Sequence, residues 1–138
     1  MADSTQTLER NREIARDFID ALSSGDADRI LGCYAKDATV WTAGALPFSG
    51  LHTTSEVPAL CAGLLGAFPE GLRFTIKALT AEGERVAIEA ESRGHHISGQ
   101  EYHQRYHILI VIRSGKIVHM KEYFDTELAR AVLMAPPA

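Results

Sequence analysis

Hydrophobic residues recur at three- and four-residue steps over residues 4–23, with Glu, Arg and Asp between them. This spacing predicts an amphipathic helix that ends at Gly25. Asp26 can cap a second, shorter helix over residues 27–34. A third helix is predicted over residues 55–68, because a serine can cap its first turn and Pro-Glu-Gly follows its last residue. The first half of the chain is therefore predicted to be mainly helical.

Branched and aromatic residues dominate the second half of the chain, in segments that short glycine-containing turns separate. This pattern predicts a meander of antiparallel strands, at residues 72–81, 85–93, 101–112 and 116–124. Before them we expect a strand over residues 38–42 and a loop over residues 43–50. One or two helical turns are expected over residues 125–134. Helices first and a curled sheet afterwards indicate an α+β domain.

The composition narrows the class of protein. The 138 residues fit a single domain, 1–138, with flexible tails at about residues 1–4 and 135–138. The formal net charge is -4 and the Lys and Arg residues are scattered, so we expect no nucleic-acid partner. No apolar leader or membrane-spanning run is present, which favours a cytoplasmic protein with no membrane partner. Cys33 and Cys61 are interpreted as small buried thiols.

One hairpin can be placed in register from the sequence. If Ser114-Gly115 is a two-residue turn, His107 lies directly opposite Glu122 on the next strand. Opposed residues on one face have Cβ atoms about 4.5–5.5 Å apart, so an imidazole and a carboxylate there can share a hydrogen bond. Arg105 lies diagonally across from the same carboxylate. A turn of odd length would remove this pairing.

The opposite face of the same hairpin is also apolar, with Tyr106, Ile108, Ile110 and Ile112 beside Ile117 and Tyr123. A sheet with one solvated face should alternate apolar and polar residues. Two apolar faces therefore predict two coverings, which are the helices of the chain on one side and a second subunit on the other. We expect a homodimer formed through the outer sheet face.

The order of elements and four sequence words resemble the SnoaL-like branch of the NTF2-like superfamily. The words are Ser-Gly-Asp-Ala-Asp (24–28), Asp-Ala-Thr-Val-Trp (37–41), Ala-Glu-Gly-Glu-Arg-Val-Ala-Ile (81–88) and Gly-Lys-Ile-Val-His-Met-Lys-Glu-Tyr-Phe-Asp (115–125). The resemblance covers nearly the whole chain. It implies an α+β, cystatin-like cone in which three N-terminal helices pack in a curved antiparallel β-sheet, with a pocket between them and a dimer through the outer sheet face. It also implies that the face with Arg105, His107 and Glu122 is the pocket face.

Particular members of the superfamily can be compared at their functional positions. Ketosteroid isomerase uses an Asp base and an oxyanion hole of Tyr and protonated Asp. Those positions fall at Phe18, Thr42 and His107, which lack the required groups, so this activity is not expected. Limonene-epoxide-hydrolase-like members place Arg, Asp and Asp where Arg105, His107 and Glu122 stand, and the first Asp is lost. Phenazine-biosynthesis-like and polyketide-cyclase-like members are more similar, with Glu122 at the acid/base position.

The sequence supports two hypotheses for function. In the first, the protein is a cofactor-independent isomerase, cyclase or hydrolase of a small apolar molecule, and Glu122 and His107 transfer a proton while Arg105 steadies negative charge. In the second, it is a non-catalytic ligand-binding or scaffold protein in which these residues form a structural ion pair. The substrate pocket is expected to be lined by Phe18, Tyr34, Trp41, Phe48, Leu109, Met120 and Phe124.

Several histidines raise the question of a metal. His95 and His96 lie in a predicted turn where adjacent side chains diverge, and His103 shares a strand face only with His107. His52 precedes the third helix, which could place it near a pocket mouth, but the favoured interpretation is an exposed loop histidine. Without a nearby carboxylate in a convincing cluster, we expect no metal site. No GxGxxG or GxxxxGK[ST] motif is present, so no cofactor is expected.

Overall fold

The computed structural model describes residues 4–138. The helices and strands follow in the order α1 (Thr5–Ser24), α2 (Ala27–Leu31), β1 (Tyr34–Thr42), β2 (Gly50–Thr53), a 3-10 turn η1 (Thr54–Glu56), α3 (Val57–Ala67), β3 (Arg73–Glu82), β4 (Arg85–His95), β5 (Glu101–Arg113), β6 (Lys116–Phe124) and α4 (Thr126–Leu133). Most of the predicted N-terminal tail, 1–4, lies outside the described residues. At the other end of the chain, the amide of Ala138 donates a hydrogen bond to the carbonyl of Ile97.

The strands form one six-stranded sheet in the order β2-β1-β6-β5-β4-β3. The predicted antiparallel meander of β3, β4, β5 and β6 is confirmed. The predicted antiparallel sheet needs one correction, because β1 runs parallel to β6. A second correction concerns β2, whose first residue closes the predicted loop and which pairs with β1. With four residues and no apolar alternation, β2 carries no local strand signal.

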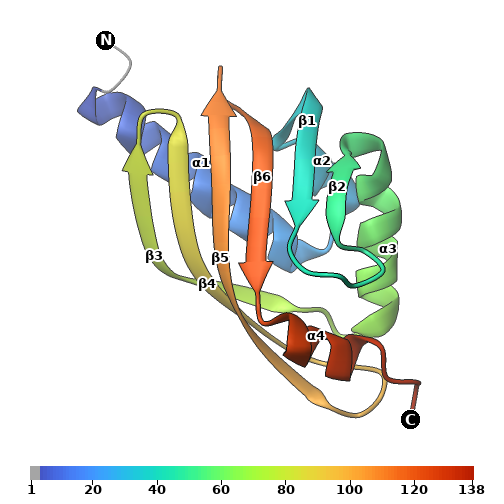
Figure 1. Ribbon diagram of the computed structural model, residues 1–138. Coiled ribbons are helices and arrows are strands. Elements are labelled where there is room, and N and C mark those ends of the chain that lie inside the picture. The colour runs from blue at the N-terminus through green and yellow to red at the C-terminus, as the bar shows by residue number, and fades with distance from the viewer. Residues whose placement is uncertain (1–3) are drawn as a thin grey trace.

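Helix α1 forms the base of the core. Ser4 caps it by accepting a hydrogen bond from the Thr7 amide, and Gly25 ends it in the left-handed conformation with φ 67°. The buried face of α1, which includes Ala15, Phe18 and Ile19, packs on the inner face of β3 and β4. Figure 1 shows α1 crossing behind the sheet, α3 standing beside β2, and α4 at the end of β6. The helices and the curved sheet line a common cavity.

The predicted register of the β5–β6 hairpin is wrong beyond its turn. Ser114 and Gly115 form the expected two-residue turn, with φ 54° and 77°. Ile112 faces Ile117 as predicted, but Val111 faces His119, so Val118 is an extra residue in β6. This β-bulge shifts the remaining pairs by one position.

The shift separates the two residues of the predicted dyad. Glu122 lies opposite Ile108, and His107 lies opposite Tyr123. Directly opposed residues point to the same side of a sheet, so Glu122 shares the inner face with Ile108. The side chain of His107 lies on the outer face, away from Glu122.

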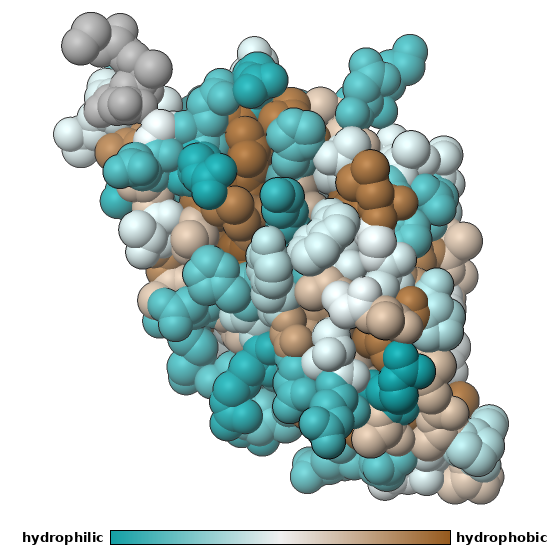
Figure 2. Space-filling view, viewed as in Figure 1, coloured by the Kyte–Doolittle hydropathy of each residue, from teal (hydrophilic) through white to brown (hydrophobic). Residues whose placement is uncertain are grey.

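The predicted assignment of the two sheet faces is reversed for β5. Tyr106, Ile108 and Ile110 point inward, and both isoleucines are fully buried. Arg105 and His107, at alternate positions, are exposed on the outer face. Figure 2 shows this face as largely hydrophilic, with hydrophobic residues confined to smaller areas. The outer face is therefore not the second apolar face that was expected, and the homodimer stays a prediction.

Candidate functional site

A cavity of about 440 Å³ lies between the inner face of the sheet, α3 and α4. Its wall is mostly apolar. The strand side includes Tyr34, Val40, Thr42, Phe74, Tyr102, Tyr106, Met120, Glu122 and Phe124, the helical side includes Leu60, Cys61, Leu64, Ala67, Leu133 and Met134, and Phe48 comes from the loop before β2. An apolar cavity of this size with few polar groups is the usual form of a small-molecule site.

Helix α3 forms one wall of this cavity. Its sequence, Val57–Ala67, contains no charged residue, and only Val57 is buried. Its main contacts are with α2 and η1 rather than with the sheet, so the cavity occupies the space between α3 and the sheet. The cavity accounts for the apolar residues on the side of α3 that faces the sheet.

The structure brings together part of the predicted pocket. Tyr34, Phe48, Met120 and Phe124 line the cavity. Phe18 lies behind this wall, fully buried on α1, with its ring 5.6 Å from that of Tyr34 in an edge-to-face contact. Trp41 and Leu109 are not in the cavity wall, because strand alternation turns them to the outer face. The ring of Trp41 packs there against that of Tyr123, at 5.1 Å.

Glu122 is the carboxyl group of the cavity. Its surface is partly accessible, as expected for a residue of a cavity wall, although protein atoms surround the carboxyl group. Burial raises the pKa of Glu122 from 4.5 to about 7, while the Thr42 hydrogen bond and the nearby His52 oppose this rise. The Thr42 hydroxyl donates to Glu122 Oε1 at 3.2 Å. Glu122 can therefore give or accept a proton near neutral pH.

His52 lies on β2, and its charge opposes the rise in the pKa of Glu122. Its Nε2 lies 2.7 Å from the Phe48 carbonyl oxygen, and its Nδ1 lies 3.1 Å from Glu56 Oε1. These two contacts raise the pKa of His52, with the Glu56 side chain contributing most. The sequence did contain a signal for the position of His52. It lies four residues before Glu56, and Glu56 forms a capping box with Thr53.

Two tyrosines and a glutamine missed by the sequence analysis lie at the end of the cavity near α4. Tyr102 and Tyr106 line the cavity, and Gln104 between them is fully buried. Gln104 donates from Nε2 to the Tyr102 hydroxyl, at 2.9 Å, and to the Asp125 carbonyl oxygen, also at 2.9 Å. In the sequence, these three residues could have been found by their spacing, since polar side chains recur at every second position of one strand face. The predicted register assigned this face to the outside of the sheet.

Arg105 and His107 do not join this group. Both are exposed on the outer face, where Glu91 instead pairs with His103 at 2.6 Å from Oε1 to Nε2. The pairing with His103 lowers the pKa of Glu91. Within residues 4–138, no group of three or more His, Cys, Asp or Glu residues could hold a metal ion. In the same part of the chain, no helix has the length and apolar character needed to cross a membrane.

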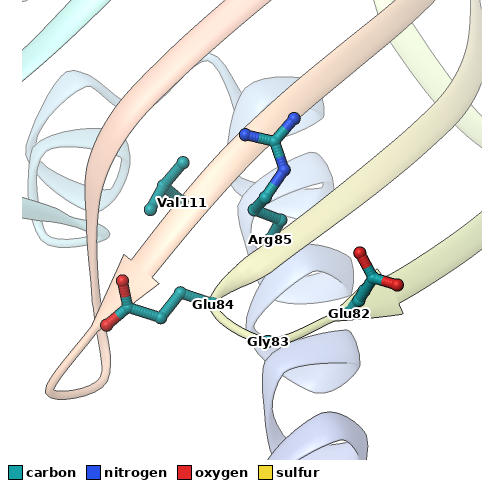
Figure 3. Close-up of a pocket in the computed structure, with 5 residues that line it drawn as sticks. All are labelled: Glu82, Gly83, Glu84, Arg85 and Val111. Atoms are coloured by element: carbon teal, nitrogen blue, oxygen red, sulfur yellow. The ribbon is translucent and has the colours of Figure 1, made fainter.

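A second hollow, of about 600 Å³, lies at the β3–β4 turn. Figure 3 shows its five lining residues, with Glu82, Glu84 and Arg85 directed away from one another. These three side chains are exposed, and Glu84 is paired with Arg113 at 2.9 Å. Among the described residues, those of this open hollow do not gather polar groups toward one point, so the smaller and less open cavity is the better candidate site.

The fold and cavity define a class of protein, in which helices close a curved mixed sheet around an internal space. The profile of the SnoaL-like domain family matches residues 15–120, so the chain belongs to this family. A search of curated proteins gave no match.

Solved structures with NTF2-like folds agree with this assignment. An NTF2-like protein of unknown function from Burkholderia pseudomallei has a TM-score of 0.82 at 19% identity, over 91% of this chain and 98% of that one. A putative SnoaL-like polyketide cyclase from Jannaschia has a TM-score of 0.79 at 19% identity, over 98% and 99%. A protein with a ketosteroid isomerase-like fold from Catenulispora acidiphila has a TM-score of 0.77 at 19% identity, over 90% and 94%. At these identities the likeness shows the fold alone.

Proposed function

We propose that the protein is an acid/base enzyme that needs no cofactor and acts on a small, largely apolar organic molecule held in the cavity. Glu122 is the residue that transfers the proton. The observation that carries this proposal is a carboxyl group in an apolar cavity with a pKa of about 7. A general acid or base works best when its pKa lies near the working pH, and an ordinary exposed glutamate does not meet this condition.

The structure changes the partners of Glu122 from those predicted. Arg105 and His107 are left out of the proposal, because both lie on the outer face. The Thr42 hydroxyl donates a hydrogen bond to one oxygen of the carboxyl group. The positive charge of His52 acts on the same group without a hydrogen bond to it. The proposed reaction is an isomerisation, a cyclisation or an addition of water, since each needs one group that moves a proton. The description of one similar structure as a putative polyketide cyclase supports cyclisation among these.

The test is turnover of small apolar ketones, lactones and epoxides in deuterated water, followed by NMR. For wild type we expect product or deuterium incorporation, with a rate that changes around the pKa of Glu122, about 7. Glu122→Gln should lower the rate by roughly 10²–10⁴-fold, the usual contribution of a general acid or base. Glu70→Gln makes the same change at an exposed turn residue and should leave the rate unchanged.

Full activity of Glu122→Gln would refute the assignment of Glu122. Ligand binding without turnover, equal in wild type and Glu122→Gln, would instead support the non-catalytic alternative. Thermal stabilisation by the bound compound reports binding separately from turnover.

A further inference from the structure

The loop over residues 43–49, between β1 and β2, contributes Phe48 to the cavity wall. His52 follows in β2, directly opposite Val40 of β1, which also lines the cavity. Directly opposed residues point to the same side of a sheet, so His52 lies on the inner face. Its Nε2 is 2.7 Å from the Phe48 carbonyl oxygen. A side chain outside the cavity wall thus contacts the backbone of a residue within it.

The two contacts of the His52 ring define its protonation state. A carbonyl oxygen only accepts, so Nε2 donates to Phe48. The other ring nitrogen, Nδ1, is 3.1 Å from Glu56 Oε1. A hydrogen bond from the Thr53 amide, followed by that from His52, lowers the pKa of Glu56, so this carboxylate has no proton to give. Both ring nitrogens therefore donate, and only the imidazolium cation can do this.

Two carboxyl groups act on this imidazolium, Glu56 from η1 and Glu122 from β6. The hydrogen bond with Glu56 contributes most to the rise in the pKa of His52, the Phe48 carbonyl oxygen comes next, and the charges of Glu56 and Glu122 add to them. In return, His52 lowers the pKa of Glu122. Such a coupling is reciprocal, so the charged forms of Glu122 and His52 stabilise each other.

We infer that His52 is a positioning residue of the site: its imidazolium, held by Glu56, fixes the backbone of Phe48 and with it the position of this ring in the cavity wall. When His52 loses a proton, Nδ1 becomes an acceptor that faces the Glu56 carboxylate, and the contact is lost. The loop is therefore held most firmly when Glu122 is ionised and can accept a proton. Only this last link rests on the proposed function, since the clamp itself needs no turnover.

The first test is a pH titration of the His52 ring by ¹⁵N NMR, in the whole protein. In wild type we expect the pKa of His52 to lie above its ordinary value of 6.5. Glu56→Gln removes the charge but keeps an oxygen for the Thr53 amide, because glutamine also forms a capping box. This variant should lower the pKa of His52. Glu70→Gln, at an exposed turn residue, should leave it unchanged.

The second test is the backbone order parameter of the Phe48 amide. We expect about 0.85 in wild type below the pKa of His52, and less than about 0.6 in His52→Leu, which has no clamp. In wild type the value should fall as the pH rises through the pKa of His52. His95→Leu makes the same change at an exposed residue of β4 and should have no effect.

The pKa of Glu122 separates the charge of His52 from a purely structural contact. Loss of this charge in His52→Leu should raise the pKa of Glu122 above its wild-type value of about 7, as carboxyl ¹³C NMR would show. His95→Leu should not raise it. A histidine that only packs against the loop would leave this pKa where it is.

An ordinary pKa for His52 in wild type, or the same pKa in wild type and Glu56→Gln, overturns the inference. So does an order parameter for Phe48 that is equal in wild type and His52→Leu, or that does not depend on pH in wild type. An unchanged pKa of Glu122 in His52→Leu overturns the link to Glu122. Full turnover by Glu122→Gln would refute the proposed function and leave the clamp in place, because neither measurement on His52 or Phe48 uses turnover.

Discussion

The raised pKa of Glu122 has a measurable consequence for folding. The folded state disfavours the ionised carboxylate, so its pKa lies at about 7 rather than 4.5. In the unfolded chain the same group ionises at its ordinary value, and at high pH folding must carry the cost of burying the charge. The stability associated with neutral Glu122 is therefore complete below about pH 4.5 and is lost as the pH rises through about 7.

The size of this effect follows from the shift in pKa. Each unit corresponds to about 1.4 kcal/mol, so a shift from 4.5 to about 7 corresponds to roughly 3 kcal/mol. About 2.5 kcal/mol of this falls between pH 5 and pH 8. Glu122→Gln has no charge to bury, so its free energy of unfolding should not show this decrease. We thus expect the variant to gain about 2.5 kcal/mol relative to wild type over this interval.

Urea unfolding at both pH values measures the difference, because all other titrating groups are common to the two proteins. Glu70→Gln, the exposed control, should follow wild type. Parallel pH dependence in wild type and Glu122→Gln would refute the reasoning. So would a large loss of stability in the variant at high pH, because breaking a buried ion pair costs about 3–5 kcal/mol and would show that Glu122 has a cationic partner.

Three further variants test the hydrogen bond to Glu122 and the packing around two glycines, one in α3 and one in β4. Thr42→Val removes the hydrogen bond that stabilises ionised Glu122 and should raise the pKa of Glu122 above its wild-type value, as NMR titration of the carboxyl carbon would show; an unchanged pKa contradicts the role of Thr42. Gly63→Ala should stabilise the protein by about 1 kcal/mol, because a Cβ on this residue of α3 meets open space. Gly94→Ala, the matched change in β4, should destabilise it by roughly 1–3 kcal/mol, because its Cβ would lie 2.9 Å from the Gly71 carbonyl oxygen. Thermal or urea unfolding of both variants measures these effects, and the same sign for both would contradict them.

Elements with strong local signals could be predicted from the sequence. Helix α1 lies within one residue of its predicted bounds, because Ser4 and Gly25 give it two well-defined ends. The bounds of β6 agree with prediction, since a two-residue turn precedes it and a capped helix follows. The third predicted helix begins instead as the 3-10 turn η1. Parallel pairing of β1 with β6 joins residues about eighty positions apart, which no local pattern encodes.

Which residues lie in the candidate site depends on pairings between distant strands. Glu122 and four of the predicted pocket residues do line the cavity, because the sequence located their strands and loop correctly. Four other predicted site residues lie on the outer face of the sheet instead of the expected inner face. These are Arg105, His107, Trp41 and Leu109. The position of His52 depends on β2, a strand that only its pairing with β1 defines.

A single residue of β6 explains both the wrong register and the position of Glu122 on the inner face. Val118 has no partner across the hairpin, and β1, which pairs with the same part of β6, is itself irregular between Tyr34 and Thr39. The bulge therefore lies in the part of β6 where the pairing with β1 is also irregular, and the turn of the hairpin alone favours the regular register. In that regular register Glu122 would share a face with His107, which would favour an ionised carboxylate. The bulge instead turns Glu122 toward an apolar cavity, where burial raises its pKa to about 7.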